Sequence, residues 1–150
     1  MRYLADVSVI TRLVHVEVAE VLAPLLVAGQ VGTCGVLELG LYALVRDPDE
    51  LAAVMRCRST AFGWLTTDDV DMHRAVQVQA LVAGTRQRLT ARPALVVAAV
   101  AERHQVSVLH YDPDFDLIAK VTGQDTMWVV PEGTVPGLAA SIEVREDRGT

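Results

Sequence analysis

The stretch "SVLHYDPDFD", residues 107–116, joins a short apolar run to three aspartates within five residues. The run before Asp112 is typical of a buried strand, and the Asp-Pro-Asp after it is typical of a turn that starts a helix. Uncompensated carboxylates at short range repel one another, so Asp112, Asp114 and Asp116 suggest a cation nearby. The alternative is a loop in which the aspartates only cap backbone N–H groups.

The composition limits the classes of protein to which the chain can belong. A chain of 150 residues that is 51% hydrophobic fits one domain with its own core. The formal net charge of -6 argues against a surface devoted to nucleic acid, although it allows a local basic patch. Zinc-ligand spacings, Gly-rich phosphate motifs and Gly-x-Ser-x-Gly are absent. Asp6 interrupts the apolar start, and Pro24 and three glycines break the run 21–37, so we expect a cytoplasmic protein without a membrane segment.

Short β-rich runs alternate with helical stretches along the chain. We expect helices up to about 28, over 36–62, 68–83, 93–104 and 113–122, and strands at 2–8, 30–34, 63–66, 106–111 and 126–131. This alternation predicts an α/β fold with a parallel sheet, helices on both faces and ligands at the carboxyl ends of the strands. We expect one domain over residues 1–134 and a C-terminal tail over 135–150 whose composition favours disorder.

Three acids fall where such a sheet places its ligands. Asp6 ends the first strand, Glu38 lies in an apolar helix after the second, and Asp112 follows a later strand. In a parallel sheet they project at the same edge. Ser8, two residues after Asp6, is a candidate cap for the next helix.

Glu38 has a second interpretation. Apolar residues surround it, so it needs a partner, and a salt bridge to an arginine such as Arg12 or Arg46 fits as well as a catalytic role.

The residue types also indicate a cofactor. Asp116 lies four residues after Asp112 and can share its face, whereas Asp114 points elsewhere. Several carboxylates without cysteine or well-placed histidine describe a site for a hard cation, Mg²⁺ or Mn²⁺.

Four segments of the sequence resemble a known family. The segments "RYLADVSVITRL", "CGVLELGLYALVR", "RPALVVAAVAERH" and "VSVLHYDPDFDLIAKVTG" are similar to PIN domains of the VapC toxin type, especially the actinobacterial group. The likeness runs from residue 1 to about residue 134. Its most specific parts are the last segment and the Asp-x-Ser at the start.

The resemblance implies a three-layer α/β/α sandwich with a five-stranded parallel sheet, and a homodimer. It also implies a magnesium-dependent endoribonuclease, the toxin of a type II toxin–antitoxin system, restrained by a VapB-type antitoxin. Carried over by residue, Asp6, Glu38 and Asp112 are the catalytic acids and metal ligands, Asp116 is an accessory metal ligand, and Ser8 supports them.

One position departs from the family pattern. Members usually carry an acid in a Pro-Asp pair before the last motif, and here the pair is Pro93-Ala94. Two origins of Ala94 fit the sequence: a substitution made to inactivate a toxic protein, or a natural family member that has lost the acid. We therefore expect weakened or absent cleavage. The alternative is a non-catalytic PIN module that binds antitoxin or RNA without cutting.

The densest positive patch lies just before Ala94. Arg86, Arg88 and Arg92 fall within seven residues, beside the expected acidic site. Contacts to RNA phosphates are one interpretation, and a solvated loop is the other.

Overall fold

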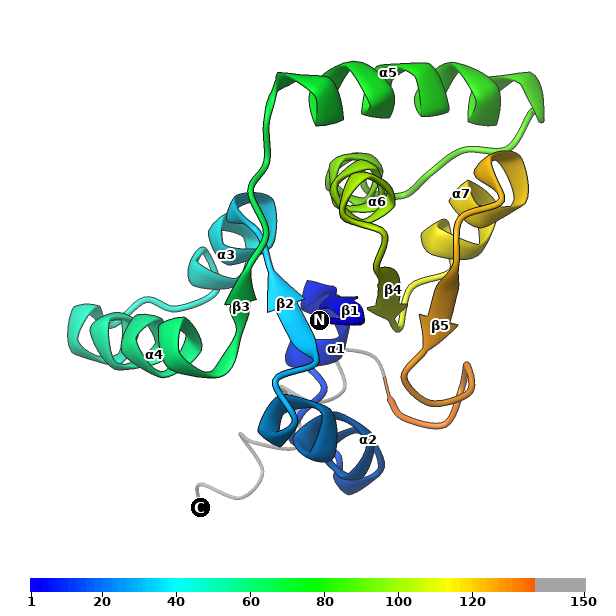
Figure 1. Ribbon diagram of the computed structural model, residues 1–150. Coiled ribbons are helices and arrows are strands. Elements are labelled where there is room, and N and C mark those ends of the chain that lie inside the picture. The colour runs from blue at the N-terminus through cyan, green and yellow to red at the C-terminus, as the bar shows by residue number, and fades with distance from the viewer. Residues whose placement is uncertain (137–150) are drawn as a thin grey trace.

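The computed structural model describes residues 1–136, and its core is a five-stranded, all-parallel sheet of order β3-β2-β1-β4-β5 (Figure 1). The α/β class and the strand number expected from the sequence are confirmed. In these residues no helix has the length and apolarity to cross a membrane. The elements in chain order are β1 (Tyr3–Ala5), α1 (Val7–Ile10), α2 (Val16–Val27), β2 (Val31–Thr33), α3 (Gly35–Tyr42), α4 (Pro48–Ala61), β3 (Gly63–Trp64), α5 (Asp69–Gly84), α6 (Pro93–His104), β4 (Ser107–His110), α7 (Asp114–Thr122) and β5 (Thr126–Trp128).

Successive strand residues face two separate cores, which explains the apolar character of the strands. Leu4 and Val108 belong to the core under α3, α5, α6 and α7, whereas Ala5 and Leu109 belong to the core under α1 and α2. Side chains alternate across a strand, so a sheet covered on both faces needs apolar residues at every position. The result is the expected three-layer α/β/α sandwich. Helix α5 packs outside the sheet layer, against α6 and α7 (Figure 1).

The sheet reverses its winding direction between β1 and β4. From β1 the chain moves outward to β2 and β3, and β4 returns to the other side of β1, where Ala5 pairs with Leu109. In open α/β sheets a crevice forms at the carboxyl ends of the strands flanking such a switch point. The residues that follow β1 and β4 therefore occupy the place where a ligand is expected.

The first strand ends earlier than the sequence-based expectation, and the expected helices over 36–62 are two. β1 ends at Ala5 rather than at residue 8, because Asp6 caps α1 by accepting a hydrogen bond from the Ser8 amide at 2.9 Å. The prediction that Ser8 is the cap was wrong: Asp6 holds that role and Ser8 lies inside the helix. The region 36–62 contains two helices, the second of which starts at Pro48 under the Asp47 cap.

The described chain continues past β5 into packed structure. The Tyr111 hydroxyl donates to the Val135 carbonyl at 3.1 Å and accepts from the Gly133 amide at 2.8 Å, and Val135 is buried. The first residue of the expected tail is thus part of the packed body. Residues 137–150 of that tail lie outside the described residues.

Candidate active site

Asp6 and Asp112 stand on the two strands that flank the switch point. The Asp6 amide donates to the Leu109 carbonyl at 2.9 Å, which joins the end of β1 to the end of β4. Burial raises the pKa of Asp112, and the negative charges of Asp114 and Asp6 raise it further. The sequence-based expectation that Asp6 and Asp112 meet at one edge of the sheet is therefore met.

Ser8 holds these two strand ends together. Its hydroxyl lies 2.5 Å from Asp6 Oδ2, to which it donates, and its Oγ accepts from the Tyr111 amide at 3.0 Å. One short side chain thereby fixes the Asp6 carboxylate and connects α1 to the segment that carries Asp112. This contact gives the supporting residue a positioning role.

The other two aspartates of the motif point in different directions. Asp116 accepts hydrogen bonds from the Trp128 indole at 2.9 and 3.1 Å. Asp114 is buried and accepts from the amides of Thr90 and Ala91, both at 2.8 Å, and from the Thr90 hydroxyl at 2.9 Å. Asp114 therefore anchors the α5–α6 loop and does not join the acids, as the sequence indicated.

His110 is a fully buried side chain beside the acids. Burial lowers its pKa, and its Nδ1 accepts from the Asp112 amide at 3.3 Å, so the ring proton belongs on Nε2. That Nε2 has no hydrogen-bond partner among the described residues, and it lies 3.9 Å from Asp116 Oδ1. A neutral, buried donor without a strong acceptor therefore lies close to Asp116.

Glu38 is held by an arginine that the sequence did not indicate. Arg58 Nη2 lies 2.5 Å from Glu38 Oε1, Arg58 Nε lies 2.9 and 3.0 Å from the two carboxylate oxygens, and the Thr33 hydroxyl also donates to Glu38. The exposed fractions of the two charged side chains are 7% and 8%. Burial alone raises the pKa of Glu38, but the hydrogen bonds from Arg58 and Thr33 outweigh it and lower the pKa.

The expected partner of Glu38 is therefore an arginine, as predicted, but it is Arg58 rather than Arg12 or Arg46. Arg12 donates to the Ser8 carbonyl at 2.8 Å and lies over the Tyr111 ring, 4.5 Å from its centroid. Arg58 comes from α4, twenty residues away in sequence. No periodicity in the sequence distinguishes it from its neighbour Arg56, because the contact depends on how α4 folds back beside β2.

The acids do not form a ready metal centre. Among residues 1–136 no three His, Cys, Asp or Glu side chains lie close enough together to hold an ion. Glu38 is already neutralised by Arg58, and Ala94 is a buried apolar residue without a carboxylate. Glu38 and position 94 therefore offer no free donor, and Asp6 and Asp112 are the carboxylates that would hold a metal. Mg²⁺ is usually bound through one or two carboxylates and several waters, which a site of this kind can provide.

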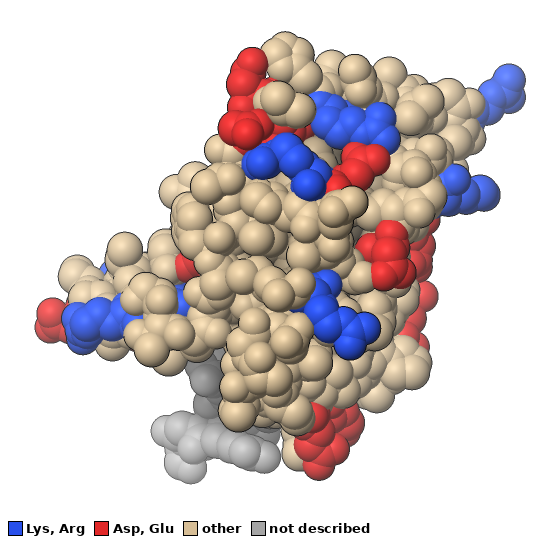
Figure 2. Space-filling model, in the orientation of Figure 1, with Lys and Arg blue, Asp and Glu red and all other residues tan. Residues whose placement is uncertain are grey.

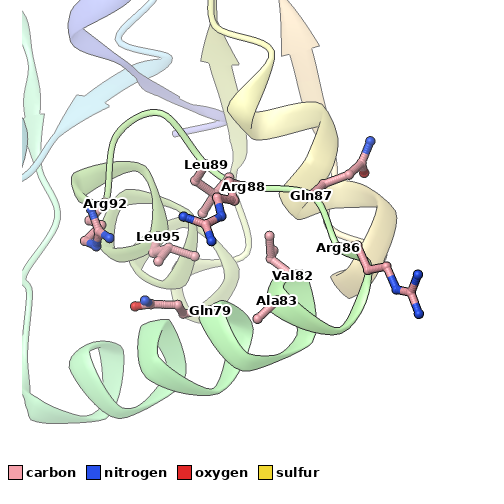
Figure 3. Close-up of a pocket in the computed structure, with 9 residues that line it drawn as sticks. All are labelled: Gln79, Val82, Ala83, Arg86, Gln87, Arg88, Leu89, Arg92 and Leu95. Carbon is pink, nitrogen blue, oxygen red and sulfur yellow. The ribbon is translucent and has the colours of Figure 1, made fainter.

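The predicted basic patch lines a cavity in the structure. Figure 3 shows this cavity, about 480 Å³ in volume, between α5, the α5–α6 loop and the start of α6; Arg86, Arg88 and Arg92 are among its lining residues. The hydrogen bonds of Asp114 tie the same loop to α7, beside Asp112. On the face shown in Figure 2, basic and acidic side chains are interspersed.

Comparisons with known proteins place this geometry in a family. A parallel sheet of this order, with aspartates after the strands at its switch point, describes a PIN-like α/β/α domain. No family model matches the sequence. Ribonuclease VapC51 of Mycobacterium tuberculosis is 40% identical over 135 residues, which cover 90% of this chain and 98% of the relative. Ribonuclease VapC21 of the same species is 36% identical over 134 residues, which cover 89% and 97%.

Solved structures support the fold. The DNA-bound VapBC complex of Salmonella typhimurium contains a chain with a TM-score of 0.70 at 12% identity, and the match covers 87% of this chain and 99% of that one. The extent and identity of the match to Ribonuclease VapC51 show that the chain belongs to the VapC ribonuclease family of toxin–antitoxin systems. The family that the four sequence segments resemble is confirmed.

Proposed function

We propose that this chain is the toxin of a type II toxin–antitoxin system, an endoribonuclease that cleaves RNA phosphodiesters with Mg²⁺ or Mn²⁺. The observation that carries the proposal is the placement of Asp6 and Asp112 on adjacent strand ends at the switch point, in a chain 40% identical to Ribonuclease VapC51. Carboxylate oxygens are the ligands that both cations prefer.

Within that site the residues take distinct roles. Asp112, whose pKa is raised by burial, can take the proton of a water that attacks phosphorus. Asp6 is held by Ser8 and supplies the second fixed charge. Asp116 is the accessory carboxylate, oriented by the Trp128 indole. Glu38 completes the acidic set only when Arg58 releases it.

The proposed activity is weak in this chain. Two features reduce the donor set: Ala94 stands where the family carries an acid, and Arg58 occupies both oxygens of Glu38. The same two features support the second candidate, a PIN module that binds antitoxin or RNA without cleavage. The two candidates differ only in whether any cleavage depends on Asp6 and Asp112.

The proposed partners are a VapB-type antitoxin, RNA and a second copy of the chain. The similar solved structures are VapBC complexes, which supports the antitoxin. The homodimer is supported by an exposed apolar stripe on α5, where Met72, Val76 and Ala80 recur every four residues.

Cleavage of a labelled RNA by matched aspartate variants tests the proposal. We expect slow cleavage by the unmodified chain, dependent on added Mg²⁺, and its loss in Asp112→Asn. Asp49→Asn, an exposed first-turn residue of α4, is the control and should cleave like the parent. Equal cleavage by the parent and Asp112→Asn would overturn the assignment of the site. No cleavage by any of the three would favour the non-catalytic module.

A further inference from the structure

The cavity of about 480 Å³ between α5 and α6 has two chemically different parts. Val82 and Leu95 are each 3% exposed and form an apolar floor with the half-buried Leu89. Figure 3 shows Arg88 and Arg92 beside this floor, together with the Gln79 amide, while the Arg86 side chain points away from them. The cavity therefore offers positive charge next to a surface that lacks polar groups.

The two inward arginines, Arg88 and Arg92, differ from the three arginines that form ion pairs in having no acid partner among the described residues. Arg58, Arg74 and Arg103 each pair with a carboxylate at 2.9 Å or less. The guanidinium groups of Arg88 and Arg92 make no hydrogen bond or ion pair with any residue of 1–136. A guanidinium stays charged at all ordinary pH values. In a chain with a net charge of -6, two unpaired guanidinium groups at one cavity indicate an anionic ligand.

The loop that carries these arginines is rigidly attached to the proposed active site. The Asp114 carboxylate accepts from the Thr90 and Ala91 amides, and the Asp114 amide donates to Asp112 Oδ1 at 2.9 Å. Two successive hydrogen-bonded links thus connect the loop to a catalytic carboxylate. A ligand in the cavity is held at a fixed position relative to Asp112.

We infer that this cavity binds one nucleotide of a single-stranded RNA substrate, at a distance along the strand from the bond that is cut. Its phosphate contacts Arg88 and Arg92, and its base covers the floor formed by Leu89 and Leu95, with Gln79 at the edge. This assignment rests on the proposed ribonuclease function. A free phosphate would use the arginines alone, and an acidic peptide would leave the apolar floor exposed to water. A nucleotide covers both parts, and the cavity volume lies within the usual range for small-ligand sites.

Binding of a short fluorescein-labelled single-stranded RNA, followed by anisotropy in EDTA, tests the inference without any cleavage. We expect Arg88→Gln and Arg92→Gln each to weaken binding about tenfold, as loss of one charge-assisted contact does. Each should also reduce the slope of log affinity against log salt by about 0.7. Arg86→Gln, in the same loop but directed away from the cavity, and Arg56→Gln, exposed on α4, are the matched controls and should change binding much less.

A neutral substitution separates the cavity from general electrostatic attraction. Ala83→Leu, at an exposed lining position of α5, narrows the cavity without changing charge. It should weaken RNA binding several-fold with an unchanged salt slope. Equal losses of RNA affinity in Arg56→Gln, Arg86→Gln and Arg88→Gln would overturn the inference. So would displacement of the labelled RNA by poly-glutamate as readily as by unlabelled RNA. Either result would leave the proposal that the protein binds RNA untouched. A parent protein that binds no RNA would overturn both the inference and the proposed function.

Discussion

Arg58 and Glu38 form a buried, two-pronged ion pair in which the guanidinium of α4 covers both carboxylate oxygens of α3 at 2.5 to 3.0 Å. The pair lies at the carboxyl-end side of β2, next to Thr33, where the family resemblance implies a metal ligand. In this conformation a side chain of the chain itself supplies the cation that Glu38 needs. Arg58 is therefore both a structural residue and a competitor for any metal at Glu38.

Removing the arginine should destabilise the fold. Arg58→Met leaves a buried carboxylate unpaired, and breaking a buried ion pair from one side costs about 3–5 kcal/mol. The free energy of unfolding, measured in urea, should fall by this amount. Arg56→Met, two residues away on the exposed side of α4, is the control and should change it by less than about 0.5 kcal/mol. Equal, small losses in both variants would show that the ion pair contributes little.

The same substitution should change the response to metal. In Arg58→Met the freed Glu38 carboxylate can accept a divalent cation, and a ligand that binds only the folded state raises its stability. Mg²⁺ at millimolar concentration should therefore raise the Tm of Arg58→Met more than that of the parent. Na⁺ at the same ionic strength and spermidine serve as controls for general charge screening. Identical Tm shifts in parent and variant would contradict the idea that Arg58 blocks a cation at Glu38.

The ion pair of Asp71 with Arg103 should make part of the free energy of unfolding depend on pH. Its pKa is lowered chiefly by the hydrogen bonds from Arg103, at 2.8 and 2.9 Å. A carboxyl group with a depressed pKa in the folded state stabilises the fold above its ordinary value of 3.8, and this contribution is lost as the pH falls through the folded pKa. Asp71→Asn should thus be less stable than the parent at pH 7, with the difference shrinking below about pH 4. A stability difference between Asp71→Asn and the parent that stays constant from pH 7 to pH 3 would contradict this role of Asp71.

Much of the fold was predictable because both faces of the sheet are covered. Leu4 and Ala5, or Val108 and Leu109, face opposite cores, so β1 and β4 carry consecutive apolar residues in the sequence rather than an alternating pattern. The placement of Asp6 and Asp112 followed from the parallel arrangement alone. The partner of Glu38 did not, because Arg58 reaches it through the angle between α3 and α4. The cap of α1 was misassigned because Asp6 and Ser8 are both good N-cap residues two positions apart.

The homodimer predicted from the family resemblance has its own test. The stripe of Met72, Val76 and Ala80 on α5 is exposed in the single chain and would be covered by a second copy. Light scattering should give the mass of two chains at micromolar concentration, and Val76→Glu should shift it toward one chain. Gln77→Glu, the exposed neighbouring position, is the matched control. A single-chain mass for the parent would contradict the dimer.

The rate of RNA cleavage tests most directly whether the missing carboxylate at position 94 limits a metal-dependent ribonuclease. The rate is measured for the parent, Ala94→Asp and Ala94→Asn, each with millimolar Mg²⁺ and with EDTA. Position 94 lies in the first turn of α6, where a carboxylate also suits the helix N-terminus. We predict slow cleavage by the parent. Ala94→Asp should be faster by about 10- to 150-fold, the range for one charge-assisted contact, and only with Mg²⁺. Ala94→Asn, of the same shape without the charge, should stay at the parent rate. Efficient Mg²⁺-dependent cleavage by the parent, unchanged in Ala94→Asp, would contradict the account.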